Sequence, residues 1–117
     1  MQPDERDAGF LSDMLRYARS VLRSVEGLAF ADYVGDDNLR WSVERRIEII
    51  GEAANRTSQA FRQAHPEIPW SKIIGQRNVL AHEYGEIEDS LVWNVATISI
   101  PELIDQLVAI LPDEPHA

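Results

Sequence analysis

The sequence predicts an all-α protein, an up-and-down bundle of four to five helices in one domain. Apolar residues recur every three or four positions over almost the whole chain, and no segment shows the alternation of a strand. A chain of 117 residues has room for one hydrophobic core, and its 44% apolar and 26% charged residues are typical of a globular domain. We therefore expect a single domain over residues 1–117, with its core at about 6–111 and a frayed tail at 112–117.

The first two helices are predicted from apolar stripes and from the residues that bound them. Helical spacing over residues 6–26 predicts a helix that ends at Gly27. Residues 28–37 form a connector with an aromatic anchor in Phe30 and Tyr33, and Asp36 or Asp37 can cap the next helix. That helix is expected to run from about 38 to 64, and its small residues near Gly51 indicate that another helix approaches closely there.

Prolines divide the second half of the chain. Residues 65–69 contain two prolines and end the long helix, after which a third helix is predicted from Trp70 to about residue 82. A fourth helix carries apolar residues from Leu91 to Ile98, Pro101 kinks or interrupts it, and a last helical stretch extends to about 111. These closing helices are apolar over wide arcs, which suits either an ordinary core or a homodimer interface.

Composition and charge exclude several functions. The chain has no cysteine, which excludes disulfides and cysteine nucleophiles, and its three histidines lack metal-ligand spacing, so no metal site is expected. It has no glycine-rich phosphate loop and no long apolar run, and we expect a cytoplasmic protein with no cofactor and no membrane contact. The net charge of −9 opposes nucleic-acid binding, but residues 88–117 carry six acidic side chains and no Lys or Arg. The remaining chain, which holds all the arginines, is only mildly acidic.

The residue types best suited to chemistry lie at the predicted end of the third helix: Arg77, His82 and Tyr84. Together they suit RNA cleavage by attack of a 2′-hydroxyl on the adjacent phosphorus. A histidine can transfer protons near neutral pH, and an arginine can stabilise the charged phosphorane. A structural interpretation is also open, in which His82 interacts with the helix dipole, Arg77 pairs with a carboxylate and Tyr84 packs as a cap.

Three further side chains are candidates for supporting roles near that helix end. Asn78 either hydrogen-bonds near the site or packs between helices. Glu48 and Glu52 lie four residues apart on one side of the second helix. They either orient Arg77 or His82, or pair with nearby arginines on a solvated face.

The segment Arg77-x4-His82-x-Tyr84 resembles the signature of the HepT-like toxins in the HEPN superfamily, from HepT/MntA-type toxin–antitoxin systems. The resemblance extends to residues 48–56, to residues 65–75 and to the closing segments at 91–93 and 101–103, and it covers about 6–111.

The resemblance implies a homodimeric helical bundle that cleaves RNA, and not DNA, without a metal. It implies that Arg77 binds phosphate and that His82 performs acid–base chemistry. It further implies a toxin of a type VII-like module, whose partner is a small nucleotidyltransferase antitoxin that adds AMP to Tyr84. The alternative is a non-catalytic helical chain that serves as the binding partner and substrate of such a nucleotidyltransferase.

Overall fold

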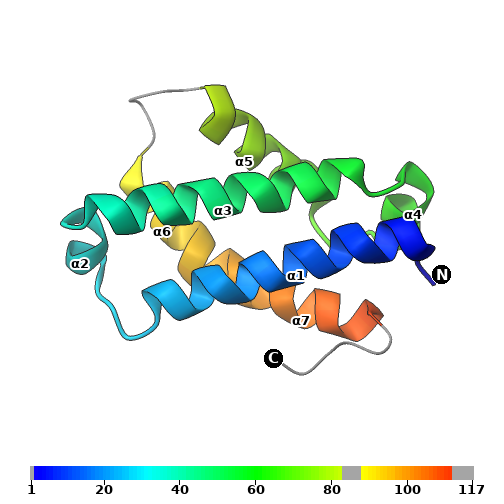
Figure 1. Cartoon of the computed structure of the whole chain (residues 1–117), viewed down its shortest axis with the longest axis horizontal. Helices are drawn as coiled ribbons and strands as arrows, with labels where there is room; N and C mark the ends of the chain where they lie inside the picture. Colours follow the sequence, from blue (N-terminus) through cyan, green and yellow to red (C-terminus); the bar gives the residue numbers. More distant parts are fainter. Residues whose placement is uncertain (1, 83–87, 112–117) are drawn as a thin grey trace.

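The computed structural model describes residues 2–82 and 88–111, with the backbone alone for Ala81 and His82, and all its regular elements over these ranges are helical. The elements are α1 (Glu5–Val25), α2 (Phe30–Val34), α3 (Asp37–Arg56), α4 (Gln59–Ala64), α5 (Trp70–His82), α6 (Asp89–Asn94), the π-helical turn η1 (Val95–Ser99) and α7 (Ile100–Ile110). The predicted all-α class is confirmed. Helices α1 and α3 lie side by side, α5 packs on α3, and α7 packs on α1 (Figure 1).

Helix α1 forms where its apolar spacing predicts it. Asp4 caps its first turn by accepting a hydrogen bond from the backbone N–H of Asp7 at 2.7 Å. The helix ends at Val25, and Gly27 then adopts φ +76°, a conformation that favours glycine. The apolar stripe of α1 is fully buried against α3 and α7, and its members include Leu11, Met14, Ala18 and Val21.

The single helix predicted over 38–64 is divided into two helices, because the chain turns at residues 57 and 58. Helix α3 ends at Arg56, and the buried hydroxyl of Thr57 donates to the carbonyl of Ala53 at 3.0 Å. Ser58 then caps α4 by accepting from the N–H of Phe61 at 3.2 Å. The N–H and hydroxyl of Ser58 also donate to the carboxylate of Asp7 at 2.8 and 2.6 Å, so α1 fixes the turn from 51 residues away.

The connector between α1 and α3 contains the short helix α2, which the sequence pattern did not predict. Tyr33 is completely buried there and its ring packs on Trp93, with 5.5 Å between the ring centres. Asp36, one of the two predicted capping residues, accepts a hydrogen bond from the N–H of Leu39 at 3.0 Å. The anchoring role of Tyr33 and a cap at the start of α3 are therefore confirmed.

The closing segment is one continuous run from α6 through η1 to α7. Pro101 lies in the first turn of α7, and the interruption takes the form of the π-helical turn just before it. The hydroxyl of Thr97 in that turn donates to the carbonyl of Trp93 at 2.8 Å. The third helix is described to His82, where its end is predicted, and residues 83–87 and the predicted frayed tail lie outside the described residues. No helix in the described ranges has the length and apolar character needed to cross a membrane.

Candidate active site at the end of helix α5

Gly51 determines how α5 lies against α3. A Cβ atom on this glycine would lie 2.2 Å from the Cβ of Arg77 and 2.9 Å from the carbonyl oxygen of Ile73. Both distances are shorter than any stable contact, so only glycine permits this crossing. The close approach predicted at Gly51 is therefore confirmed, and the helix that approaches is the one that carries Arg77.

The side chain of Arg77 is half-buried, yet its guanidinium group forms few hydrogen bonds. Its Nη1 donates to the Oδ1 of Asn78 at 3.0 Å, and its Nε is buried without a hydrogen-bond partner. No carboxylate in the described ranges forms an ion pair with Arg77, so the carboxylate partner of the structural interpretation is not found there. An arginine with an unused donor can donate a hydrogen bond to a phosphate oxygen, and burial strengthens such a charged hydrogen bond.

The structure places Glu48 and Glu52 in ion pairs with arginines of their own helix. Glu48 lies 3.1 Å from Arg45, and Glu52 lies 3.2 Å from Arg56. Both arginines are largely exposed, and such surface pairs contribute about 0–1 kcal/mol to stability. The structure therefore brings Asn78 to Arg77 but records no contact between Arg77 and either glutamate.

The two remaining candidates fall at the boundary of the described chain. His82 is the last residue of α5, one helical turn and a fraction beyond Arg77, and its side chain lies outside the described residues. Tyr84 belongs to residues 83–87, which also lie outside them. The roles predicted for these two residues consequently stay predictions.

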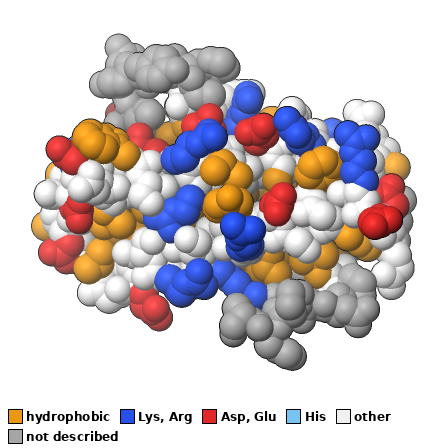
Figure 2. Space-filling model, in the orientation of Figure 1, with side chains coloured by type: hydrophobic (Ala, Val, Ile, Leu, Met, Phe, Trp, Pro, Cys, Tyr) orange, Lys and Arg blue, Asp and Glu red, His pale blue; other side chains and the backbone are white. Residues whose placement is uncertain are grey.

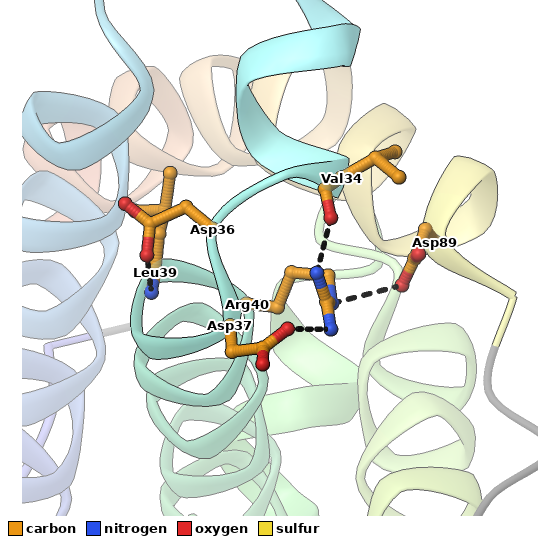
Figure 3. A network of polar contacts seen from close by, with 6 residues as sticks. All are labelled: Val34, Asp36, Asp37, Leu39, Arg40 and Asp89. Atoms are coloured by element: carbon orange, nitrogen blue, oxygen red, sulfur yellow. Dashed lines mark hydrogen bonds and ion pairs between the residues drawn. The ribbon is translucent and has the colours of Figure 1, made fainter.

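Arg40 contacts Asp89, the first residue of α6, which is the first helix after residues 83–87 (Figure 3). Its guanidinium donates to the carbonyl of Val34 and to the carboxylate of Asp37, and its Nε lies 3.7 Å from the Oδ1 of Asp89. The hydrogen bond to Asp37 is the main cause that raises the pKa of Arg40. Arg40 thus joins α2, α3 and α6. Spacing rules could not find this contact, because Arg40 and Asp89 are far apart in the sequence.

Burial and acidic neighbours raise the pKa of two groups near Arg40, the hydroxyl of Tyr33 and the carboxyl of Glu44. Burial, followed by the charges of Glu44 and Asp89, raises the pKa of Tyr33, whose hydroxyl has no hydrogen-bond partner. Burial and the charge of Asp89 likewise raise the pKa of Glu44. Both shifts are therefore in the direction of the neutral form of each group.

An apolar groove lies beside the last turns of α5. It has a volume of about 730 Å³, and α3, α5, α6 and η1 line it. Its apolar residues are Ile47, Val79, Leu80, Leu91, Val92 and Val95. Leu91 is 61% exposed and Val79 is 43% exposed, so the groove presents apolar side chains to solvent. In the described ranges, no cluster of three His, Asp or Glu side chains could hold a metal ion.

Fold and site together define an all-α, HEPN-like bundle with a cationic centre, Arg77, at a glycine-enforced helix crossing. The family model for ribonuclease HepT-like proteins matches residues 14–110, so the chain belongs to the HepT-like ribonuclease family. No solved structure matches the chain at a significant level.

Curated relatives match over most of their length. The chain is 35% identical to "Putative RNase TTE0752" of Caldanaerobacter subterraneus subsp. tengcongensis over 105 residues, which cover 90% of this chain and 94% of the relative. It is 32% identical to "Putative RNase MJ1380" of Methanocaldococcus jannaschii, over 80% of this chain and 86% of the relative. It is 30% identical to "Probable ribonuclease HepT" of Thermococcus cleftensis, with the same coverages.

Proposed function

We propose that the chain is a cytoplasmic endoribonuclease that cleaves RNA without a metal and acts as the toxin of a toxin–antitoxin module. The family and the names of its relatives support the ribonuclease activity. The observation that carries the proposal is the half-buried Arg77 in the second half of α5, which has an unused Nε donor and no described carboxylate partner.

In the proposed reaction, the 2′-oxygen of a nucleotide attacks the adjacent phosphorus. A bond forms between the 2′-oxygen and phosphorus while the bond to the 5′-oxygen breaks. His82, from one or both copies of a dimer, accepts the proton of the 2′-hydroxyl or returns one to the leaving 5′-oxygen. Arg77 stabilises the extra negative charge on the phosphorane oxygens. The products carry a 2′,3′-cyclic phosphate and a 5′-hydroxyl.

The proposed antitoxin is a small nucleotidyltransferase that silences this site through Tyr84. The tyrosine hydroxyl attacks the α-phosphorus of ATP, AMP is transferred, and pyrophosphate leaves. The added phosphate places negative charge and bulk two residues from His82, so it repels RNA and blocks access. A purified chain that carries AMP would be heavier by the mass of each AMP group added, which intact-mass measurement detects.

To test the nuclease proposal, purified protein is incubated with total RNA in EDTA, and the new RNA ends are mapped beside those made by His82→Ala. We expect the wild type alone to cleave and to leave cyclic phosphate ends. Cleavage that stops in EDTA would contradict metal independence, and equal cleavage by His82→Ala would contradict the mechanism. If unmodified wild-type protein does not cleave, the non-catalytic partner of a nucleotidyltransferase becomes the better interpretation.

The proposed homodimer would cover the apolar groove and bring two sites together. Leu91 lies on the groove and is exposed in the single chain, so Leu91→Glu should fold normally as a monomer. We expect this change to convert a dimer into a monomer in analytical ultracentrifugation and to reduce RNA cleavage strongly. The matched control is Val108→Glu on α7, since Val108 is also exposed but does not line the groove. A dimer that survives Leu91→Glu would exclude this face as the interface.

A further inference from the structure

A basic strip crosses the opposite flank of α3 from the candidate site. We define it as Arg16 and Arg23 of α1 together with Arg46 of α3. Residues 16, 20, 23 and 24 lie on one side of α1, because they follow helical spacing. Figure 2 shows basic side chains gathered over α1 and α3 on this face of the molecule.

Arg46 is held entirely by neutral oxygen atoms. Its Nη1 donates to the hydroxyls of Ser20 and Ser24 at 2.7 and 2.8 Å. Its Nη2 donates to the hydroxyl of Ser42 at 2.8 Å, and its Nε donates to the carbonyl of the same residue at 3.0 Å. These contacts fix the guanidinium group in one orientation and leave its positive charge uncompensated. Burial and the nearby charge of Arg23 lower the pKa of Arg46.

The two other arginines of the strip also lack acidic partners in the part of the chain that the structure describes. Arg23 forms no described ion pair, and Arg16 lies over the ring of Tyr17, 5.2 Å from its centre. The exposed arginines of α3 differ, since Arg45 and Arg56 each pair with a glutamate. In a chain of net charge −9, three arginines without a described carboxylate partner form a distinct local field.

We propose that this strip binds the sugar–phosphate backbone of RNA at nucleotides outside the cleavage site. Arginine and serine side chains are common phosphate ligands, and Arg16 and Arg23 lie about 10 Å apart along the helix. The strip lacks the exposed aromatic and aliphatic anchors that are typical of a protein-binding surface.

The proposal rests on the proposed function, because it takes RNA as the substrate. Arg46 reaches α1 from one flank of α3, while Gly51 meets α5 on the other. The strip and the candidate site are therefore separated by about the 10 Å width of one helix. A dinucleotide at Arg77 cannot reach the strip, whereas a longer single strand can pass across α3 and contact both.

The test compares a long RNA with a dinucleotide. Binding is measured by fluorescence anisotropy with a labelled 2′-O-methyl RNA of 20 nucleotides, which lacks the nucleophile of the proposed reaction. We expect the double change Arg16→Gln and Arg23→Gln to weaken binding at least about tenfold. The slope of log K against log salt should become shallower by about 1.4, as loss of two phosphate contacts requires. Cleavage of a dinucleotide should keep its wild-type kcat/KM.

The matched control is Arg45→Gln with Arg56→Gln, which removes the same charge from two exposed arginines of α3 that pair with glutamates. If both double variants weaken RNA binding equally, the effect is due to net charge, and the proposal that the strip binds RNA is wrong. If the Arg16 and Arg23 double variant binds the long RNA as the wild type does and cleaves the dinucleotide normally, the proposed RNA binding at the strip is wrong and the proposed function stands. If the wild-type protein neither binds nor cleaves RNA, both the proposed function and the proposed RNA binding at the strip are wrong.

Discussion

Replacing Arg77 by alanine is expected to lower the rate of RNA cleavage by about 10²–10³-fold, the usual loss when one donor to a developing oxyanion is removed. The change deletes the guanidinium group but keeps the Cβ atom that packs against Gly51. The deleted group makes one described hydrogen bond, to Asn78, and its Nε has no partner. Stability should therefore change little, and circular dichroism should report a normal helical fold.

The effect of Arg77→Ala is measured as kcat/KM on a short RNA, together with the midpoint of urea unfolding. Arg45→Ala is the control, since it removes the same charge from an exposed position of α3. We expect the control to cleave the short RNA at nearly the wild-type rate. Comparable losses in the two variants would show that Arg77 contributes only charge. An unfolded Arg77→Ala protein would show that the side chain is required for the fold.

Replacing Gly51 by alanine is expected to destabilise the bundle and to impair cleavage at the same time. The added methyl group would lie 2.2 Å from the Cβ of Arg77, so α5 must move away from α3. Overpacking of this kind typically costs about 1–3 kcal/mol. The higher helix propensity of alanine offsets about 1 kcal/mol of that cost. Because the displaced helix carries Arg77, activity should fall even where the protein stays folded.

Gly9 provides a matched control for Gly51→Ala. It also lies within a helix, and a Cβ atom there would meet nothing within 4 Å. Gly9→Ala should therefore stabilise the protein by about 0.5–1 kcal/mol in urea unfolding and leave cleavage unchanged. If Gly51→Ala stabilises the protein as much as Gly9→Ala does, the close crossing of α3 and α5 is not a constraint in solution.

Local signals in the sequence were sufficient to predict most of the fold. The apolar stripe of α1, the stop at Gly27 and the break at residues 65–69 depend on near neighbours, and the structure has them where the pattern indicates. Gly51 was informative because a glycine inside a helix needs a packing reason. The turn at residues 57 and 58 was not predicted, since its stabilising partner is Asp7, far away in the sequence. Helical periodicity alone continues through such a turn.

The candidate site was predicted less completely. Residue types and spacing singled out Arg77, and the structure adds its close contact with Gly51 and a buried Nε without a hydrogen-bond partner. The contact of Arg40 with Asp89 and the cluster around Arg46 are tertiary features, so no spacing rule could reveal them. Glu48 and Glu52 share a helix side as predicted, but that pattern could not decide between arginine pairing and a role at Arg77. In the structure, both glutamates form ion pairs with arginines of α3.

The contact between Asp7 and Ser58 couples two helix starts that are distant in sequence. Ser58 donates to Asp7 with its hydroxyl and accepts from the N–H of Phe61 with the same oxygen atom. Opening of the first turn of α1 therefore removes the support of the α4 cap, and loss of the cap exposes the carboxylate of Asp7. The amide protons at both starts should exchange with solvent as one cooperative unit, although α4 directly follows α3 along the chain.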